Sequence, residues 1–297
     1  MVLASVCVFR YFSPLVSNRM PLIANSILSR AFFSLLPRRG LQVAASASSS
    51  NSTSQLDSVA PVTERWKPLC LYHTQGKCTK ADDVSHLAKF NHNCFKDLQV
   101  NAADLKCLCS QHLDYVLVLD LEGKVEILEF PVIIIDAKTL DVVDFFHSVW
   151  HDTAIPFKDV LQQFETWISH HCLWERELGG TLRQAAFVTC GNWDLKTKVP
   201  QQCKVSKVKL PQYFMEWINL KDIYLNFYHR RATGMMTMMK ELEIPLVGSH
   251  HLGIDDTKNI SRVLQRMLVD GVVLHITARR HSSSPENVDF LFKNRIR

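Results

Sequence analysis

Residues 115–137, YVLVLDLEGKVEILEFPVIIIDA, contain two long apolar runs, and the first of them ends in acids. Apolar runs of this length predict buried strands over YVLVLDLE and VEILEFPVIIIDA. Side chains two residues apart on a strand point to the same face. Asp120 and Glu122 are therefore predicted to share a face, while Leu121 points the other way, into the core. Pro131 in the second run has no amide hydrogen, which favours a bulge or an edge position.

Downstream of these two strands the pattern alternates between strand and helix. The apolar run 185–190 predicts a short buried strand, after which Asn192 is expected to cap a helix with Asp194 in its first turn. Three antiparallel strands followed by this alternation predict an α/β fold with a mixed central sheet flanked by helices. The other predicted elements are strands at 140–150 and 272–276 and helices at 154–171, 234–244 and 255–271.

The bulk composition is that of a globular protein with one sizeable core. The chain has 297 residues, 47% of them hydrophobic, and a formal net charge of +5. Five of the 34 basic residues lie in residues 1–56, and all 29 acids lie after residue 56, so the rest of the chain is formally neutral. Net charge alone therefore gives no argument for nucleic-acid binding.

Residues 1–56 have the composition of a leader. They contain arginine but no lysine and no acid, and they are rich in serine, which is typical of an organelle transit peptide. The alternative is a disordered tail of biased composition. The serine content favours a chloroplast, with a mitochondrion as the alternative organelle. The apolar stretches are too short or too interrupted to span a bilayer, so no membrane partner is expected. The expected organisation is a transit peptide and linker at 1–56, a Cys/His-rich segment at 65–109, a main domain at 113–277 and a loosely ordered tail at 278–297.

The Cys/His-rich segment offers ligands for a metal. The nine cysteines of the chain show no disulfide framework, so reduced thiols are expected. Cys70, Cys78, His86 and His92 have the spacing Cys-x₇-Cys-x₇-His-x₅-His, a permissible tetrahedral set for one structural Zn²⁺. Cys94 or His73 could replace a ligand, and the alternative is a small loop that packs on the main domain without a metal. With zinc bound, the module could hold RNA.

Acids and a histidine at the ends of the predicted elements suggest a second metal site. Carboxylates that converge in space are costly unless a cation neutralises them, and hard oxygen ligands suit Mg²⁺ or Mn²⁺. A nearby histidine adds a group that titrates near neutral pH, and His251 or its neighbour His250 could supply it. Together these groups describe a two-metal phosphodiesterase site. The acids are Asp120, Glu122, Asp194 and Asp256.

The order of these residues resembles the DEDDh group of 3′→5′ exonucleases. In that group an acid-x-Glu motif on the first strand is followed by a central Asp and by a His-x-x-x-x-Asp motif. The longer stretches LDLEG…EILEFPVIIIDAKTL, FVTCGNWDLK, WINLKDIY and GIDDTKNISRVLQRML are similar to the enhanced-RNAi/histone-mRNA exonuclease family. The resemblance covers about residues 113–277 and implies an RNase H-like fold. With its leader, the chain looks most like a plant, organelle-targeted member.

The resemblance also implies roles for individual residues. Glu122 would both bind metal and position the attacking water, and His251 would be the general base. Trp193 packs either near the terminal base or in the core, and Asn219 is expected to contact substrate. The implied activity is a 3′→5′ exoribonuclease that trims RNA 3′ ends, such as those of rRNA or small RNA, and releases nucleoside 5′-monophosphates. Two Mg²⁺ or Mn²⁺ ions would be held by Asp120, Glu122, Asp194 and Asp256.

The chain departs from the family pattern in two places. The loop after Glu122 is only GKV, where relatives have a longer one. FFHSVWHDTAIPF then runs directly from the third strand into the next helix, where relatives have a further stretch with a helix that lines the substrate cleft. Two other functions therefore stay open: a 3′→5′ exonuclease that acts on DNA, and a catalytically impaired RNA-binding protein.

Overall fold

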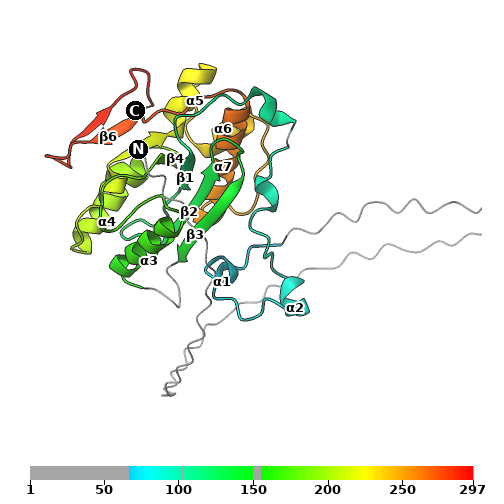
Figure 1. The fold of residues 1–297 in the computed structure, drawn as a ribbon. Helices are drawn as coiled ribbons and strands as arrows, with labels where there is room; N and C mark the ends of the chain where they lie inside the picture. Colours follow the sequence, from blue (N-terminus) through cyan, green and yellow to red (C-terminus); the bar gives the residue numbers. More distant parts are fainter. Residues whose placement is uncertain (1–66, 102, 150–154, 297) are drawn as a thin grey trace, which may run out of the picture. The chain divides into compact units, whose positions relative to one another are not determined.

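The computed structural model describes residues 67–296 apart from 102 and 150–154, and these belong to one compact unit, Thr63–Arg297. A mixed seven-stranded sheet in the order β3-β2-β1-β4-β5-β6-β7 forms its centre (Figure 1). β1 pairs antiparallel with β2 and parallel with β4, so the predicted mixed sheet is confirmed. The strands are β1 Tyr115–Leu119, β2 Glu129–Asp136, β3 Val142–Val149, β4 Ala185–Thr189, β5 Glu216–Asn219, β6 Ala278–Arg280 and β7 Val288–Phe290.

Helices cover both faces of the sheet. α3 and α4 lie on one face, and α6 and α7 lie on the other (Figure 1). Short 3₁₀ helices at Lys96–Leu98, Asp104–Cys107 and Gln212–Phe214 and a π-helical turn at Asp194–Lys198 complete the described elements. The helices are α1 Leu71–Thr74, α2 Val84–Leu87, α3 Phe157–His170, α4 Val199–Val205, α5 Leu220–Tyr228, α6 Met235–Glu241 and α7 Gly253–Val269.

Alternation along the central strands divides the apolar residues between two cores. Val116 and Val118 of β1 pack with α6 and α7, whereas Leu117 and Leu119 pack with α3 and α4. Leu121, which was predicted to point into the core, is buried in the second of these clusters. The period-two pattern of the sequence therefore fixes the face to which each side chain points, including those of the two acids after β1.

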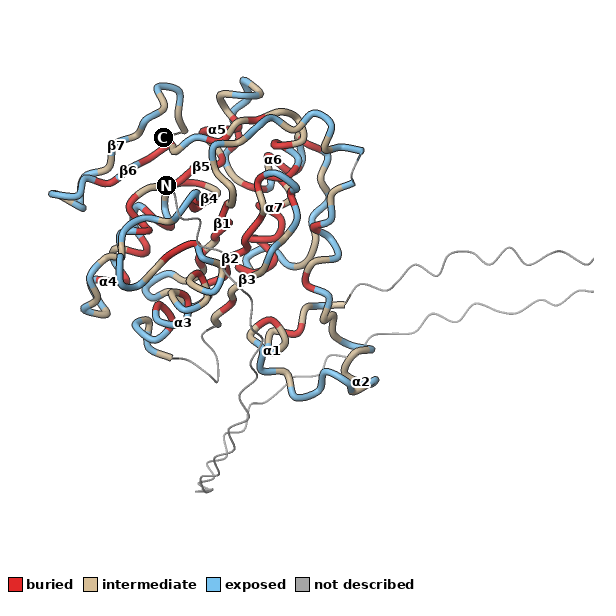
Figure 2. Tube along the Cα trace, viewed as in Figure 1, coloured by how far each residue is buried: buried red, intermediate tan, exposed pale blue. Residues whose placement is uncertain are grey.

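α7 is buried far more completely than a surface helix. Fourteen of its seventeen residues are buried, which requires cover on the side away from the sheet (Figure 2). Part of this cover comes from the Cys/His-rich segment, since Phe95, Leu98 and Leu105 pack in the same cluster as the helix. The buried side chain of Gln265 donates hydrogen bonds to the carbonyls of Leu98 and Leu140, both at 2.8 Å. The segment that precedes the sheet therefore belongs to the packing of α7.

The C-terminal part of the described chain differs from the prediction. Residues 272–276, predicted as a strand, form no ladder. The tail 278–297, expected to be loosely ordered, instead contributes the hairpin β6–β7, which adds two strands at the β5 edge of the sheet. The sequence of β6, ARR, gives no strand signal, because it contains no apolar run. The strand forms through its pairing with Glu216 and Trp217 of β5.

Two further local predictions were wrong in detail. The β2–β3 register shift lies at Ile134/Ile135 and not at Pro131. Pro131 pairs with His147 of β3 but lies beyond the end of the β1–β2 ladder, so its missing N–H removes no hydrogen bond to β1. Asn192 does not cap the helix after β4, because its side-chain oxygen accepts a hydrogen bond from Trp217 Nε1 at 3.0 Å. Within the described residues, none of the helices has the length and apolar character needed to cross a membrane.

Candidate active site

The end of β1 places two acids beside the start of α7. Asp120 follows the last residue of β1, and Glu122 forms an isolated bridge with Glu129 at the start of β2. A tight turn returns the chain between them. Gly123 adopts φ 126°, and a Cβ there would collide with the carbonyl oxygen of Glu126. Carboxylate oxygens of Asp120, Glu122 and Asp256 all lie within 4.8 Å of one another. Two acids from the end of β1 and one from the start of α7 therefore meet at one point.

Asp194 reaches this point from the far side of β1. It lies in the π-helical turn after β4, and its Oδ1 accepts a hydrogen bond from the backbone N–H of Leu121 at 3.0 Å. Leu121 is the residue between the two acids. Asp194 stands outside the group of three within 4.8 Å, but its charge is the largest charge effect on the pKa of Asp120. The structure thus places all four predicted acids in one neighbourhood.

Two histidines flank Asp256 on its open side. His250 Nδ1 donates to both oxygens of Asp256 at 3.0 Å, and the backbone N–H of His251 donates to Oδ2 at 2.8 Å. Both histidines are exposed, and their rings stack with centroids 3.9 Å apart. The backbone of His251 has φ 69°, so a left-handed turn aims its ring. The His250 ring bonds to Asp256, whereas the exposed His251 ring has a nitrogen within 4.8 Å of the Asp256 carboxylate without a hydrogen bond to it.

The acids raise one another's pKa values. Burial, and then the charges of Asp194, Asp256 and Glu122, raise the pKa of Asp120 well above its ordinary value. Burial raises the pKa of Asp194 to about 6, and burial followed by the charge of Asp256 raises that of Glu122. A cation between these oxygens would relieve both burial and repulsion. Hard carboxylate donors with this repulsion suit a divalent ion such as Mg²⁺ or Mn²⁺.

Comparison with known proteins agrees with this geometry. The model of the exonuclease family RNase_T matches residues 151–264. An uncharacterized exonuclease domain-containing protein of Arabidopsis thaliana is 58% identical over 260 residues, which cover 78% of this chain and 77% of the relative. Human 3′-5′ exoribonuclease 1 is 30% identical over 205 residues, 58% of this chain and 57% of that protein. The nuclease domain of 3′hExo, a DEDDh family member bound to rAMP, matches with a TM-score of 0.50 and 29% identity over 56% of this chain and 96% of that one. The chain belongs to the DEDDh exonucleases.

A further solved structure supports the RNase H-like fold of this DEDDh exonuclease. It is a 3′-exonuclease described in the 3′-end-specific recognition of a histone mRNA stem-loop, with a TM-score of 0.54, 27% identity and coverage of 61% of this chain and 92% of that one. The DEDDh fold implies divalent metal ions at the acidic site. The match with the Arabidopsis relative extends over 260 positions but includes only about 232 residues of this exonuclease (78% of 297), so about 28 of the matched positions have no residue in this chain.

Glu129 is an acid of this exonuclease that sequence reasoning missed. Its carboxylate accepts hydrogen bonds from the backbone N–H groups of Gly253 and Ile254 at 2.8 and 2.7 Å and from His147 Nε2 at 2.9 Å. Burial raises its pKa, but these hydrogen bonds outweigh burial, and the pKa lies below its ordinary value. Glu129 therefore caps the start of α7 as a carboxylate. The available signal was an acid inside the apolar run EILEFPVIII.

The two predicted substrate contacts have different outcomes. Trp193 is 47% exposed beside Asp194, so the core position is wrong for it, and Lys198 Nζ lies 5.5 Å from its ring centroid. Asn219 is fully buried, accepts a hydrogen bond from the N–H of Lys221 at 3.1 Å and donates to Asp222 at 2.7 Å. Asn219 is therefore the N-cap of α5 and not a substrate contact. Its position before LKD fits the ordinary role of Asn at a helix start.

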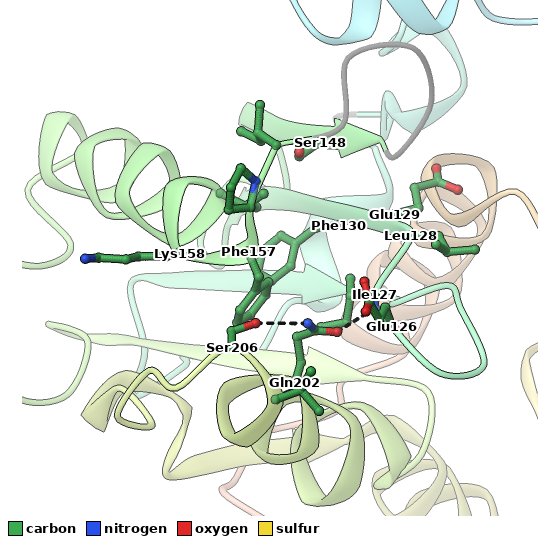
Figure 3. A pocket seen from close by; sticks show the side chains of 14 residues that line it. Glu126, Ile127, Leu128, Glu129, Phe130, Ser148, Phe157, Lys158, Gln202 and Ser206 are labelled. Atoms are coloured by element: carbon green, nitrogen blue, oxygen red, sulfur yellow. Dashed lines mark hydrogen bonds between the residues drawn. The ribbon is translucent and has the colours of Figure 1, made fainter.

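A pocket of about 460 Å³ includes Glu129, whose backbone pairs with that of Glu122, among its lining residues (Figure 3). Ile127, Phe130 and Phe157 give it an apolar floor, and Glu126, Lys158 and Ser148 give it polar edges. Gln202 ties its two sides together, because its Oε1 accepts from the N–H of Ile127 at 2.8 Å and its Nε2 donates to Ser206 at 3.1 Å. The β3–α3 connection, which the sequence predicts to be shorter than in relatives, lies partly in residues 150–154, outside the described residues.

The four predicted zinc ligands converge in this exonuclease. Each offers a ligand atom within 4.8 Å of the other three. Cys78 Sγ lies 3.6 Å from His86 Nε2 and 3.8 Å from His92 Nε2, and the two Nε2 atoms are 3.0 Å apart. A tetrahedral Zn²⁺ requires S–N and N–N edges of about 3.6 and 3.3 Å. The alternative ligand His73 stacks on His92 with centroids 4.1 Å apart, and Cys94 Sγ faces the carbonyl of His92. The cluster of Cys70, Cys78, His86 and His92 is called the Cys/His cluster below.

Proposed function

We propose that this protein is a metal-dependent 3′→5′ exoribonuclease that removes nucleotides from RNA 3′ ends as nucleoside 5′-monophosphates. The observation that carries this proposal is that carboxylate oxygens of Asp120, Glu122 and Asp256 lie within 4.8 Å of one another. Asp194 accepts a hydrogen bond from the backbone of Leu121, and Asp256 accepts hydrogen bonds from His250 and His251. Asp120, Glu122, Asp194 and Asp256 would hold two Mg²⁺ or Mn²⁺ ions. When bound, the ions would supply Lewis-acid stabilisation of the charge that develops on the phosphate.

Side chains of the protein would carry out the remaining steps: proton transfer, positioning of the water and binding of the terminal base. The exposed ring of His251 accepts a proton from the attacking water as general base. Asp256 holds the turn that aims this ring, through its hydrogen bond from the His251 backbone. Glu122, whose backbone pairs with that of Glu129 at the start of β2, positions the water. Trp193, exposed next to Asp194, offers an aromatic face on which any terminal base stacks.

RNA as the substrate is supported by the relatives. Human, rat and mouse proteins named 3′-5′ exoribonuclease 1 match at 29–30% identity, and this chain matches 57% of the length of each. The histone mRNA stem-loop of the solved 3′-exonuclease is an RNA with a defined 3′ end. rRNA or small RNA with a short 3′ overhang is the substrate proposed here.

We also propose one structural Zn²⁺ in the Cys/His cluster, on the basis of its near-tetrahedral distances. Full-length protein purified without chelator is expected to contain one zinc per chain by elemental analysis. His92→Ala is expected to lose it, and Cys172→Ser, at an exposed cysteine far from the cluster in sequence, is expected to keep it. A wild-type zinc content below about 0.1 ion per chain would refute this proposal.

The proposed location is the chloroplast, with the mitochondrion as the alternative. The support is the acid-free, serine-rich composition of residues 1–56, which lie outside the described residues. Residues 1–56 fused to a fluorescent protein are expected to direct it to chloroplasts in plant cells. Diffuse fluorescence would remove the targeting proposal and leave a biased N-terminal segment.

The test of the activity uses a 5′-labelled RNA with a short 3′ overhang. Full-length protein with Mg²⁺ is expected to give a ladder that shortens from the 3′ end, and EDTA or Asp256→Asn is expected to stop it. Asp141→Asn, in an exposed turn between β2 and β3, is the matched control that keeps activity. A DNA oligomer of the same sequence runs in parallel, and faster shortening of DNA would replace RNA as the substrate.

A second candidate function, an RNA-binding protein with an impaired nuclease site, is supported by the gaps in the match with the Arabidopsis relative. About 28 of the 260 matched positions have no residue in this chain. Binding of the RNA by folded protein, without release of monophosphates in Mg²⁺ or Mn²⁺, would make it an RNA-binding protein with an impaired site.

A further inference from the structure

A chain of hydrogen bonds connects the Cys/His cluster to the active site. It begins at Thr74, the last residue of α1, and passes through His147 of β3 to Glu129 of β2. The distances are 2.7 Å from His147 Nδ1 to Thr74 Oγ1 and 2.9 Å from His147 Nε2 to Glu129 Oε1. All three residues are buried, with 5–6% of their surface exposed. Hydrogen bonds are electrostatically stronger where water is excluded, as it is around these buried residues.

The donor to Glu129 can be assigned from the other partners of its carboxylate. At the other end of the chain, the Thr74 hydroxyl lies 2.9 Å from the carbonyl of Leu71 and 2.7 Å from His147 Nδ1. Glu129 already accepts two backbone N–H groups, so it also accepts from His147 Nε2. His147 therefore donates to Glu129 through Nε2 and pairs with the Thr74 hydroxyl through Nδ1, so it joins two residues that lie 55 positions apart in the sequence.

Glu129 contacts both parts of the active site, the segment after β1 that carries Glu122 and the start of α7. Its backbone pairs with that of Glu122, and its carboxylate fixes the first two N–H groups of α7. The preceding residue, Leu252, supplies no side-chain cap to α7. Gly253 leaves the necessary room, since a Cβ there would lie 2.9 Å from Glu129 Cδ and 3.2 Å from Glu122 Cγ. Asp256 sits in the helical turn that Glu129 caps.

The other end of the chain is fixed by the cluster. α1 begins directly after Cys70 and is followed by Cys78, so two ligands of the cluster bracket it. The N–H of Cys70 also bonds to the carbonyl of Asn91 at 3.1 Å, next to the ligand His92. A metal in the cluster would therefore hold the helix that presents Thr74.

We propose that the zinc-bound Cys/His cluster positions the nuclease site through Thr74, His147 and Glu129, and so sets its affinity for catalytic divalent ions and its turnover. Thr74 and His147 are positioning residues, because neither lies within reach of the reacting atoms. The effect on turnover rests on the proposed exoribonuclease function, whereas the effect on divalent-ion affinity does not. Outer partners that orient metal ligands commonly change affinity or activity by about ten- to a hundredfold.

The first experiment compares Thr74→Val with Thr74→Ser in the full-length protein. Valine keeps the shape and removes the hydroxyl, whereas serine keeps the hydroxyl. Mn²⁺ binding to the acidic site is followed by electron paramagnetic resonance, with Asp120→Asn to identify that site. Thr74→Val is expected to weaken Mn²⁺ binding and to lower kcat by about tenfold, the lower end of that range, with KM for RNA unchanged, and Thr74→Ser to restore both.

The second experiment interrupts the chain at its middle residue and, separately, removes the zinc at its outer end. His147→Gln retains one donor and is expected to weaken Mn²⁺ binding as Thr74→Val does. His92→Ala, which removes zinc, is expected to weaken it at least as much, while Cys172→Ser changes nothing. Thermal unfolding is recorded for every variant, so that loss of fold is separated from loss of positioning.

The outcomes separate the two proposals. Folded Thr74→Val and His147→Gln proteins with wild-type Mn²⁺ affinity would overturn the positioning role, even if both melt at lower temperature. Wild-type protein that binds Mn²⁺ but degrades no RNA would overturn the proposed function alone, and the Mn²⁺ titrations would still decide whether the cluster positions the site.

Discussion

Asp194 accepts the backbone N–H of Leu121 at 3.0 Å, and this contact sets the π-helical turn after β4 against the end of β1. The two residues are 73 positions apart, yet the contact is buried. Leu121 separates Asp120 from Glu122, so the same hydrogen bond fixes the peptide between two acids of the site. Asp194 thus has a structural role besides its proposed role in binding metal.

Asp120→Asn is expected to separate activity from stability. Exonuclease activity should fall by at least about a hundredfold, because a ligand to the ions is lost. In EDTA the variant should melt at a higher temperature than the wild type, since burial and neighbouring charges raise the pKa of Asp120 and disfavour its ionised form. Activity assays and thermal unfolding with and without Mg²⁺ measure both effects. Asp141→Asn serves as control, and a lower melting temperature for Asp120→Asn in EDTA would contradict the expected repulsion.

The stability of the metal-free protein is expected to depend on the protonation of Asp194. Its pKa is about 6 in the folded protein against an ordinary 3.8, so the folded state binds the proton more tightly. Stability from this group therefore rises as pH falls through 6, and the gain is complete near pH 4. The shift corresponds to about 3 kcal/mol.

Urea unfolding in EDTA at pH 7.5 and pH 5 tests this pH dependence. Glu129 and Asp144 have lowered pKa values and act in the opposite direction, so the comparison is between the wild type and Asp194→Asn. The variant should lack the gain at pH 5, and Mg²⁺ should remove it from the wild type. The same pH response in both proteins would refute the assignment to Asp194.

Gly253→Ala is expected to disturb the site although alanine favours a helix. The added Cβ would lie 2.9 Å from Glu129 Cδ and 3.2 Å from Glu122 Cγ, so one of these acids must move. Because misplacement by about 1 Å costs large factors in rate, kcat should fall by at least about tenfold. Gly234→Ala is the matched control, since nothing lies within 4 Å of a Cβ there. Equal kcat values for the two variants would show that the close approach at Gly253 is unimportant.

Trp193→Ala is expected to weaken RNA binding with little loss of stability. The ring is 47% exposed, so little core packing is lost, whereas a stacked base contributes about 1–3 kcal/mol. KM for RNA should rise about tenfold, and Trp193→Phe should keep most of the stacking. Steady-state kinetics and thermal unfolding measure the two properties. A large fall in melting temperature with unchanged KM would assign Trp193 a structural role only.

The central elements could be predicted from the sequence because their signals are local. β1 and β2 are apolar runs, α3 has helical spacing, and each formed where it was expected. β6 and β7 were missed, because ARR has no apolar run and the alternation of VDF is only three residues long; β6 depends on pairing with β5, and β7 on pairing with β6. Asn219 was misassigned for a related reason: its capping bond is local, but its complete burial depends on the sheet and on Thr277, whose hydroxyl accepts the Asn219 N–H.

The sequence by itself determined the order of the acids, the spacing of the Cys/His ligands and the face of β1 to which Asp120 and Glu122 point. These follow from backbone periodicity and ligand spacing, which need no knowledge of distant residues. Only the tertiary structure decided that Asp194 bonds to Leu121, that His250 and not His251 holds Asp256 through its ring, and that Glu129 caps α7. Such contacts depend on how the strands and α7 pack, because burial forces each polar group to find a partner wherever the fold brings one within reach.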